Sequence, residues 1–193
     1  MGEDKSRRVS DSIMKKYLLF SLFALLFLAC HTPNKQSIQD SIQNSLLTTE
    51  DYAKIHNQLR EQHFQGHPLL RNSSLERDAQ NYANYLAQTG KFSHDPTNRS
   101  HKYGENLYAF SRNTTPNLKS IIQKWYNEQQ YYNYSNNKCK SGEMCGHYTQ
   151  IIWKTSQKIG CASAQYQKGR FKGGYVTVCK YYPYGNIVGK RPY

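Results

Sequence analysis

The stretch Cys145-Gly-His-Tyr-Thr-Gln-Ile-Ile-Trp-Lys-Thr-Ser-Gln-Lys-Ile-Gly-Cys-Ala162 changes its hydrophobic period halfway along. From Gly146 to Trp153 the apolar side chains recur at helical spacing, and after Ser156 they alternate as in a strand. The pattern predicts a short helix that begins beside one cysteine and leads into a strand carrying another. His147 lies in the first turn of that helix, where its side chain would project beyond the helix end into a cleft.

Two helices are predicted earlier in the chain from capping residues and apolar stripes. The first begins at the N-cap segment Thr-Thr-Glu-Asp at 48–51 and continues to about Phe64. The second begins at Ser73, whose side chain would form a capping box with Glu76. It ends at Gly90, because glycine is the residue type that most often follows the last turn of a helix.

A third helix is predicted with Thr115 as its N-cap and Pro116 at its first helical position. Its apolar stripe reaches Trp125, and the next residue on the same side is Glu128. A carboxylate on a buried face is costly unless another group pairs with it. The pattern therefore indicates a partner for Glu128 inside the fold.

Strands are predicted at about 159–166 and 175–182, joined by a glycine-rich turn centred on residue 170. This register places Cys161 directly opposite Cys179. A cross-strand disulfide between them follows from the register.

A second, local disulfide is predicted between Cys139 and Cys145, which are separated by five residues that include a glycine. Helices that flank a short antiparallel sheet give an α+β domain. No internal repeat and no cue for a second domain is visible.

The first 47 residues are interpreted as an export leader and a tether. Within residues 1–29, the pair Lys15-Lys16 is followed by an apolar run too short for a membrane span, as in a signal peptide. The run ends in Leu-Phe-Leu-Ala-Cys30, which is close to a bacterial lipobox and predicts lipidation of Cys30. The alternative is an ordinary signal peptide with an incidental cysteine. Met14 is an alternative start, residues 30–47 form the polar tether, and residues 48–193 form the domain.

On either interpretation the domain is exported. It would be a membrane-anchored lipoprotein on the cell surface or in the periplasm, or otherwise a secreted protein. In such compartments disulfides are permitted.

The chain is strongly basic, with a formal net charge of +13, and residues 30–193 retain +11 after the leader is set aside. This balance favours anionic partners such as a membrane surface or an envelope polymer. The alternative is a basic surface that only keeps the protein soluble. Nucleic acid is not an expected partner, because neither a dense basic run nor a nucleic-acid motif is present.

The sequence resembles the CAP superfamily, which comprises cysteine-rich secretory proteins, antigen 5 proteins and plant pathogenesis-related class 1 proteins. Gly-His-Tyr-Thr-Gln-Ile-Ile-Trp at 146–153 matches one family signature, and the stretch 175–187 matches a second. The ending Gly-Lys-Arg-Pro-Tyr at 189–193 is similar to the plant type. The resemblance covers about residues 50–193 and implies a three-layer α-β-α sandwich. It also implies the two disulfides predicted above, and a third family disulfide is missing here.

The resemblance implies a cleft surrounded by two histidines and two glutamates, here His94, Glu105, Glu128 and His147. In several relatives the histidines bind a divalent metal, commonly Zn²⁺, and the glutamates support them from the second shell. Two ligands would bind zinc weakly. The alternative is a buried hydrogen-bond network without metal. No nucleophile is evident for catalysis, since Ser93 beside His94 is adjacent only in sequence.

The resemblance also implies a lipid-binding region after the third helix, where relatives are associated with sterol binding. Aromatic side chains there would line an apolar slot. These residues are Trp125, Tyr126, Tyr131, Tyr132 and Tyr134. The alternative is that the tyrosines only cover a small hydrophobic core.

These features favour an exported, membrane-tethered domain that binds a sterol, another lipid, or a protein partner on a host or envelope surface. One alternative is a metal-dependent hydrolase that uses the two histidines and two glutamates. Another is a purely structural, disulfide-braced interaction domain.

Overall fold

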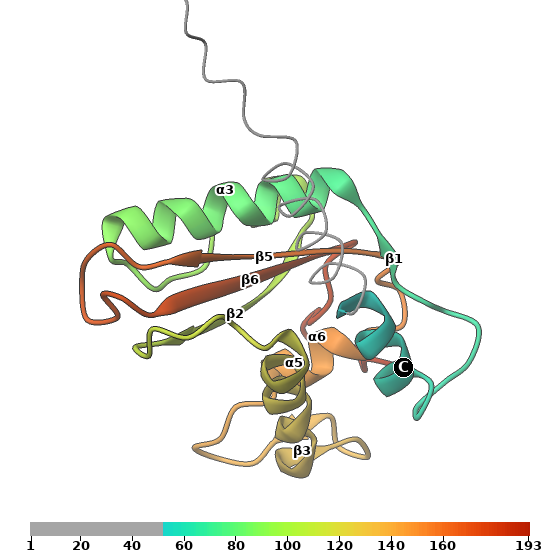
Figure 1. Ribbon diagram of the computed structural model, residues 1–193. Helices are drawn as coiled ribbons and strands as arrows, with labels where there is room; N and C mark the ends of the chain where they lie inside the picture. The colour runs from blue at the N-terminus through green and yellow to red at the C-terminus, as the bar shows by residue number, and fades with distance from the viewer. Residues whose placement is uncertain (1–51) are drawn as a thin grey trace, which may run out of the picture. The chain divides into compact units, whose positions relative to one another are not determined.

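The computed structural model describes residues 52–193, and Figure 1 shows their arrangement. The predicted leader, Cys30, the tether and the helix cap at 48–51 lie outside the described residues. Within residues 52–193, no helix has both the length and the apolar character needed to cross a membrane.

A four-stranded sheet in the order β1-β5-β6-β2 forms the middle layer of the domain. Its strands are β1 (Leu70–Arg71), β2 (Gly104–Phe110), β5 (Lys158–Gln165) and β6 (Tyr175–Tyr182). Strand β6 is antiparallel to both β5 and β2, whereas the short β1 is parallel to β5. The sheet is therefore mixed, and β2 is an outer strand.

Both predicted disulfides are present. Cys161 and Cys179 are register partners on β5 and β6, and their sulfurs are bonded at 2.06 Å in the buried core. Cys139 and Cys145 are bonded at 2.05 Å and close a surface loop. A small second sheet, formed by β3 (Tyr132–Asn133) and β4 (Lys138–Cys139), directly precedes this loop, and Cys139 is its last residue.

Helix α3 (Ser73–Thr89) covers one face of the sheet (Figure 1). Its apolar stripe contributes the buried residues Leu75, Ala79, Tyr82, Ala83, Leu86 and Ala87. Gly160 on β5 permits the close approach, because a Cβ at that position would lie 2.2 Å from the backbone nitrogen of Glu76.

The opposite face is covered by the helical residues 52–60 and by two short helices. These are α5 (Leu118–Tyr126), which continues as the 3₁₀ helix η1 (Asn127–Tyr131), and α6 (Gly146–Ile151). They bury one apolar cluster against the sheet, while α3 buries another on the other side. The predicted three-layer α-β-α architecture is confirmed, and Figure 1 shows α3 and the α5–α6 pair on opposite sides.

Predicted helix boundaries need three corrections. The N-cap of α3 is Asn72 and not Ser73, because the Asn72 side chain accepts the Leu75 N–H at 3.0 Å. Glu76 forms no capping box and instead accepts a 2.5 Å hydrogen bond from the Tyr52 hydroxyl. The first helix ends at residue 60 and is followed by turns, so it does not reach Phe64.

The third correction concerns α5, whose N-cap is Asn117 and not Thr115. The Asn117 side chain accepts the Ser120 N–H at 2.9 Å, so Pro116 lies before the helix. At the other end Glu128 lies in η1, two residues beyond the end of α5, and it contacts His147 at the start of α6. The predicted C-terminal glycine of α3, Gly90, is confirmed in the left-handed conformation at φ 73°.

Candidate functional site

A cavity of about 450 Å³ lies beside β2, the outer strand of the sheet. Its apolar lining comes from Phe92, Leu107, Tyr108, Ala109, Trp125 and Met144. Trp125 closes part of the strand edge, because its indole N–H donates to the Leu107 carbonyl at 3.3 Å. The polar lining includes both predicted histidines, His94 and His147.

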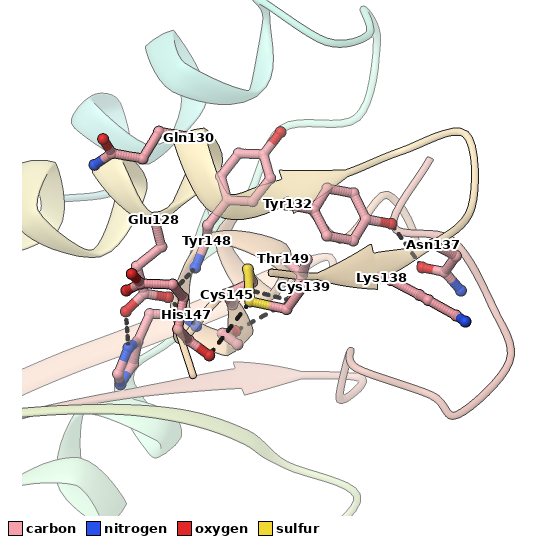
Figure 2. The surroundings of a disulfide bond; sticks show 12 residues. Glu128, Gln130, Tyr132, Asn137, Lys138, Cys139, Cys145, His147, Tyr148 and Thr149 are labelled. Carbon is pink, nitrogen blue, oxygen red and sulfur yellow. Dashed lines mark hydrogen bonds and ion pairs between the residues drawn. A yellow bond between two sulfur atoms is a disulfide. The ribbon is translucent and has the colours of Figure 1, made fainter. Parts of the chain in front are cut away.

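His147 is held by Glu128 at the start of α6. Its Nδ1 lies 2.5 Å from Glu128 Oε1, while Glu128 Oε2 accepts the backbone N–H groups of His147 and Tyr148. The carboxylate therefore satisfies free amides at a helix N-terminus and orients the imidazole at the same time. Figure 2 shows this pair next to the Cys139–Cys145 disulfide.

His94 is held by Glu105 in the same way. Its Nδ1 lies 2.7 Å from Glu105 Oε1, which also accepts the backbone N–H of Asp95 at 3.1 Å. The Glu105 side chain is only 2% exposed, and its Oε2 has no hydrogen-bond partner within residues 52–193. The nearest cation to Oε2 is the Lys180 ammonium at 3.7 Å.

Lys180 is a buried member of this site that is absent from the residues predicted from the sequence. It is 1% exposed and lies opposite Glu105 in the β2–β6 register. Its Nζ donates to Asp95 at 2.7 Å and to Asn98 at 2.8 Å, where Asn98 begins the short helix α4 (Asn98–His101). Burial opposes ionisation of Asp95, but hydrogen bonds from Lys180 and Thr97 hold its pKa below the ordinary value.

The position of Lys180 carried one signal in the sequence. It is the one charged residue in the otherwise apolar or hydroxyl-bearing strand 175–182. A charge in a strand with buried neighbours on both sides predicts a buried partner, although the partner's identity cannot be read from the strand itself.

The two imidazoles have the orientation that metal-binding histidines use. An ionised carboxylate can only accept hydrogen bonds, so the Nδ1 atom that faces it in each ring must carry the proton. The other ring nitrogen, Nε2, is then free to bind a metal or another ligand. Within the described part of the chain, no three His, Cys, Asp or Glu side chains are grouped to hold a metal ion. The donor set thus fits at most an open site with His94 and His147 as its two protein ligands, and the metal-binding role of these residues stays a prediction.

The aromatic ring of Trp125 stacks on His147, with centroids 5.9 Å apart and planes inclined by 18°. Trp125 belongs to the predicted lipid-binding set, and it lines the cavity. A ligand or metal bound beside His147 would therefore lie next to the indole.

The four tyrosines of the predicted set lie elsewhere. Tyr126 and Tyr132 pack on Tyr148 with centroids 5.5 and 5.8 Å apart, and Tyr134 stacks on Tyr193. Tyr131, the fourth, is half-buried at the end of η1 and lies near the ammonium group of a lysine, Lys140. This arrangement agrees with the alternative in which tyrosines cover a small core, and lipid binding by them stays a prediction.

Two histidines outside the cavity, His56 and His63, support the fold. His56 is fully buried, with Nδ1 2.7 Å from the Tyr52 carbonyl and Nε2 2.9 Å from the Tyr181 hydroxyl. Burial, together with the nearby positive charge of Arg60, lowers the pKa of His56 to about 4. His63 lies between two tyrosine hydroxyls, and burial lowers its pKa as well.

Comparisons with known proteins agree with this geometry. Residues 53–181 match the family model described as CAP, cysteine-rich secretory protein family. The chain is 36% identical over 186 residues to pathogenesis-related protein 1C of Nicotiana tabacum, covering 94% of this chain and 96% of that protein. It is 36% identical over 181 residues to pathogenesis-related protein PR-1 of Medicago truncatula, covering 90% and 96%.

Two solved structures show the same fold at lower sequence identity. Schistosoma mansoni venom allergen-like protein 4 aligns with a TM-score of 0.58 and 23% identity, covering 76% of this chain and 93% of that one. NaASP2, crystallised with Zn²⁺, aligns with a TM-score of 0.55 and 22% identity, covering 76% and 87%.

Proposed function

Since this chain belongs to the CAP (cysteine-rich secretory protein) family, we propose that it is an exported binding protein for a small apolar ligand. The ligand class is a sterol or another lipid, and its site is the cavity beside β2. The observation that carries this proposal is the cavity's composition, an apolar wall that ends at two oriented imidazoles. The two disulfides support export, because such bonds persist in oxidising compartments.

The cavity has the size and lining of a small-molecule site. Its volume of about 450 Å³ falls within the range of roughly 300–1,000 Å³ that is usual for ligand pockets. Phe92 and Met144 line it and still expose much of their apolar surface to water. A ligand that covered these side chains would gain hydrophobic free energy.

The imidazoles give the cavity a polar end. Nε2 of His94 or His147 can bond a hydroxyl or carboxylate of the ligand, or it can bind a divalent metal. Zinc suits imidazole nitrogen, and a site with two protein ligands would hold it weakly and leave other coordination positions open. The zinc in the NaASP2 crystal belongs to that protein and supports the same expectation here.

A metal-dependent hydrolase is less well supported than a binding protein. Catalytic zinc usually has three protein ligands, and the described residues offer two at this cavity. Ser93 lines the cavity, but its hydroxyl forms no hydrogen bond with an imidazole among the described contacts.

Fluorescence tests the proposal, because the chain has two tryptophans and only Trp125 lines the cavity. The Trp153→Phe variant leaves Trp125 as the single reporter. Titration with a fluorescent sterol and with a fluorescent polyene fatty acid should quench Trp125 and sensitise the probe. Ala109→Phe should abolish the response by filling the cavity. Val188→Phe, at an exposed position away from the cavity, is the matched control.

The result that would overturn the proposal is equal probe binding by Ala109→Phe and Val188→Phe. A loss of binding in both variants would count against it too, since filling the cavity would then have no specific effect. Circular dichroism of each variant checks that the domain is folded.

A further inference from the structure

Three loops meet at the end of the sheet where β5 turns into β6 (Figure 1). The turn at 166–174 contacts the loop after α3, because the Tyr166 hydroxyl donates to the Lys91 carbonyl at 2.9 Å. The side-chain amide of Gln165 donates to Asn113 at 2.8 Å, which joins the turn to the segment after β2. We call this surface the hairpin end.

The hairpin end is densely basic. It carries five exposed cationic side chains, which are Lys91, Arg112, Lys168, Arg170 and Lys172. The segments that meet there, 81–93, 106–127 and 162–178, contain no aspartate or glutamate. Within residues 52–193, none of these five cations forms a salt bridge. Their charge is therefore directed to solvent or to a partner.

Aromatic rings lie among these cations. Phe92 is 41% exposed and packs edge-on against Phe171, whose ring is covered by the Arg170 guanidinium at 4.5 Å. Tyr85 is also exposed, and its hydroxyl accepts a hydrogen bond from the Lys91 ammonium. Cations beside exposed rings are typical of surfaces that enter the headgroup region of a bilayer, where phosphates meet the cations and rings reach the acyl boundary.

From these contacts we infer that the hairpin end is a docking surface for an anionic lipid bilayer. A soluble polyanion would satisfy the five charges but would leave Phe92 in water, so the rings favour a membrane. Phe92 also lines the cavity beside β2, so the docked face presents the cavity mouth to the lipid. Docking is independent of the proposed function, whereas transfer of a ligand from the bilayer rests on it.

Vesicle flotation tests docking with the full chain carrying Cys30→Ala, so that no attached lipid contributes. The protein should bind vesicles of phosphatidylcholine with 30% phosphatidylglycerol at 50 mM salt and dissociate at 500 mM. It should not bind phosphatidylcholine alone. The triple variant Lys168→Gln, Arg170→Gln, Lys172→Gln should bind about 100-fold more weakly, since each basic residue near an anionic surface contributes about fivefold.

A charge-matched triple variant separates location from net charge. Lys54→Gln, Lys154→Gln, Lys190→Gln removes the same number of exposed charges outside the hairpin end and should retain most binding. Equal weakening by both triple variants would overturn the inference, because only net charge would then matter.

Two further variants distinguish the bilayer from a soluble polyanion and docking from ligand binding. Phe92→Ser should weaken vesicle binding severalfold and leave retention on heparin unchanged. If Phe92→Ser binds vesicles as the parent does, the surface is a polyanion site and the membrane assignment is wrong. Ala109→Phe should dock normally although its cavity is filled, so failure of the ligand proposal is distinguishable from failure of docking.

Discussion

The buried His56 should make the stability of the domain depend on pH between 6.5 and 4. Its Nδ1–H donates to the Tyr52 carbonyl, and its Nε2 accepts from the Tyr181 hydroxyl, whose oxygen in turn accepts the Asn106 amide at 3.2 Å. Protonation of Nε2 would place an N–H donor against the Tyr181 hydroxyl, which already donates to this nitrogen, in a site without water access. Burial, with a further contribution from the charge of Arg60, therefore lowers the pKa of His56 to about 4.

The sign of the pH effect on stability depends on whether the folded or the unfolded chain binds the proton of His56 more tightly. An unfolded histidine titrates near 6.5, so below that pH the unfolded chain binds a proton that the folded chain does not. The contribution of His56 is complete above pH 6.5 and is lost as the pH falls towards 4. The gap between the two pKa values corresponds to a loss of about 3 kcal/mol in the free energy of unfolding.

Urea unfolding of the wild type and of His56→Phe at pH 7, 6, 5 and 4 measures this loss. The variant should be about 1–3 kcal/mol less stable at pH 7, because the Tyr181 hydroxyl loses its acceptor. Because the wild type alone loses about 3 kcal/mol by pH 4, its advantage over His56→Phe should disappear or change sign at that pH. Other acid-sensitive groups, such as Asp95, cancel in the difference. Parallel pH profiles of stability for wild type and His56→Phe, or for wild type and the second variant His56→Gln, would show that His56 is not the source of the pH dependence.

Three further predictions concern the metal, a helix cap and the leader. His147→Ala should abolish zinc binding in titration calorimetry, and Glu128→Gln should weaken it several-fold; unchanged affinity in His147→Ala would place the metal elsewhere. Asn72→Ala should lower the free energy of unfolding by about 1 kcal/mol, while Ser73→Ala changes it by less than about 0.5 kcal/mol; the reverse order in urea unfolding would contradict the observed cap. Cys30→Ala should move the protein from the membrane to the soluble fraction of its host; a wild-type protein found already soluble would show that the leader does not direct lipidation.

The sequence predicted the structure best where the hydrophobic pattern of a strand also determined which residues of two strands pair. Cys161 and Cys179 lie at equal distances from a single turn, so any hairpin of the predicted register brings them together. The position of His147 could also be predicted, because the helix begins one residue before it. The first residue of helix α3 could not be predicted in the same way. Asn72 and Ser73 are both good capping residues, and only their backbone geometry shows which of them is the N-cap.

The cavity and its buried cation depend on contacts between distant segments, which periodicity does not report. Lys180 reaches Asp95 and Asn98 across more than 80 residues of sequence. The predicted apolar slot comprised Trp125 and the four tyrosines that follow it, and of these five residues Trp125 alone lines the cavity along the edge of β2. An outer strand offers an unpaired backbone edge, and no local pattern shows which helix will cover it.

Photoaffinity labelling can show whether the cavity beside β2 holds an apolar ligand. The full chain would be exposed to a diazirine sterol and a diazirine fatty acid, irradiated, digested and mapped by mass spectrometry, with excess unlabelled lipid as competitor. We expect competable labelling of peptides that contain Leu107–Ala109, Trp125 or Met144, and its loss in Ala109→Phe. Competable labelling confined to residues 131–134, or labelling that Ala109→Phe leaves unchanged, would contradict it.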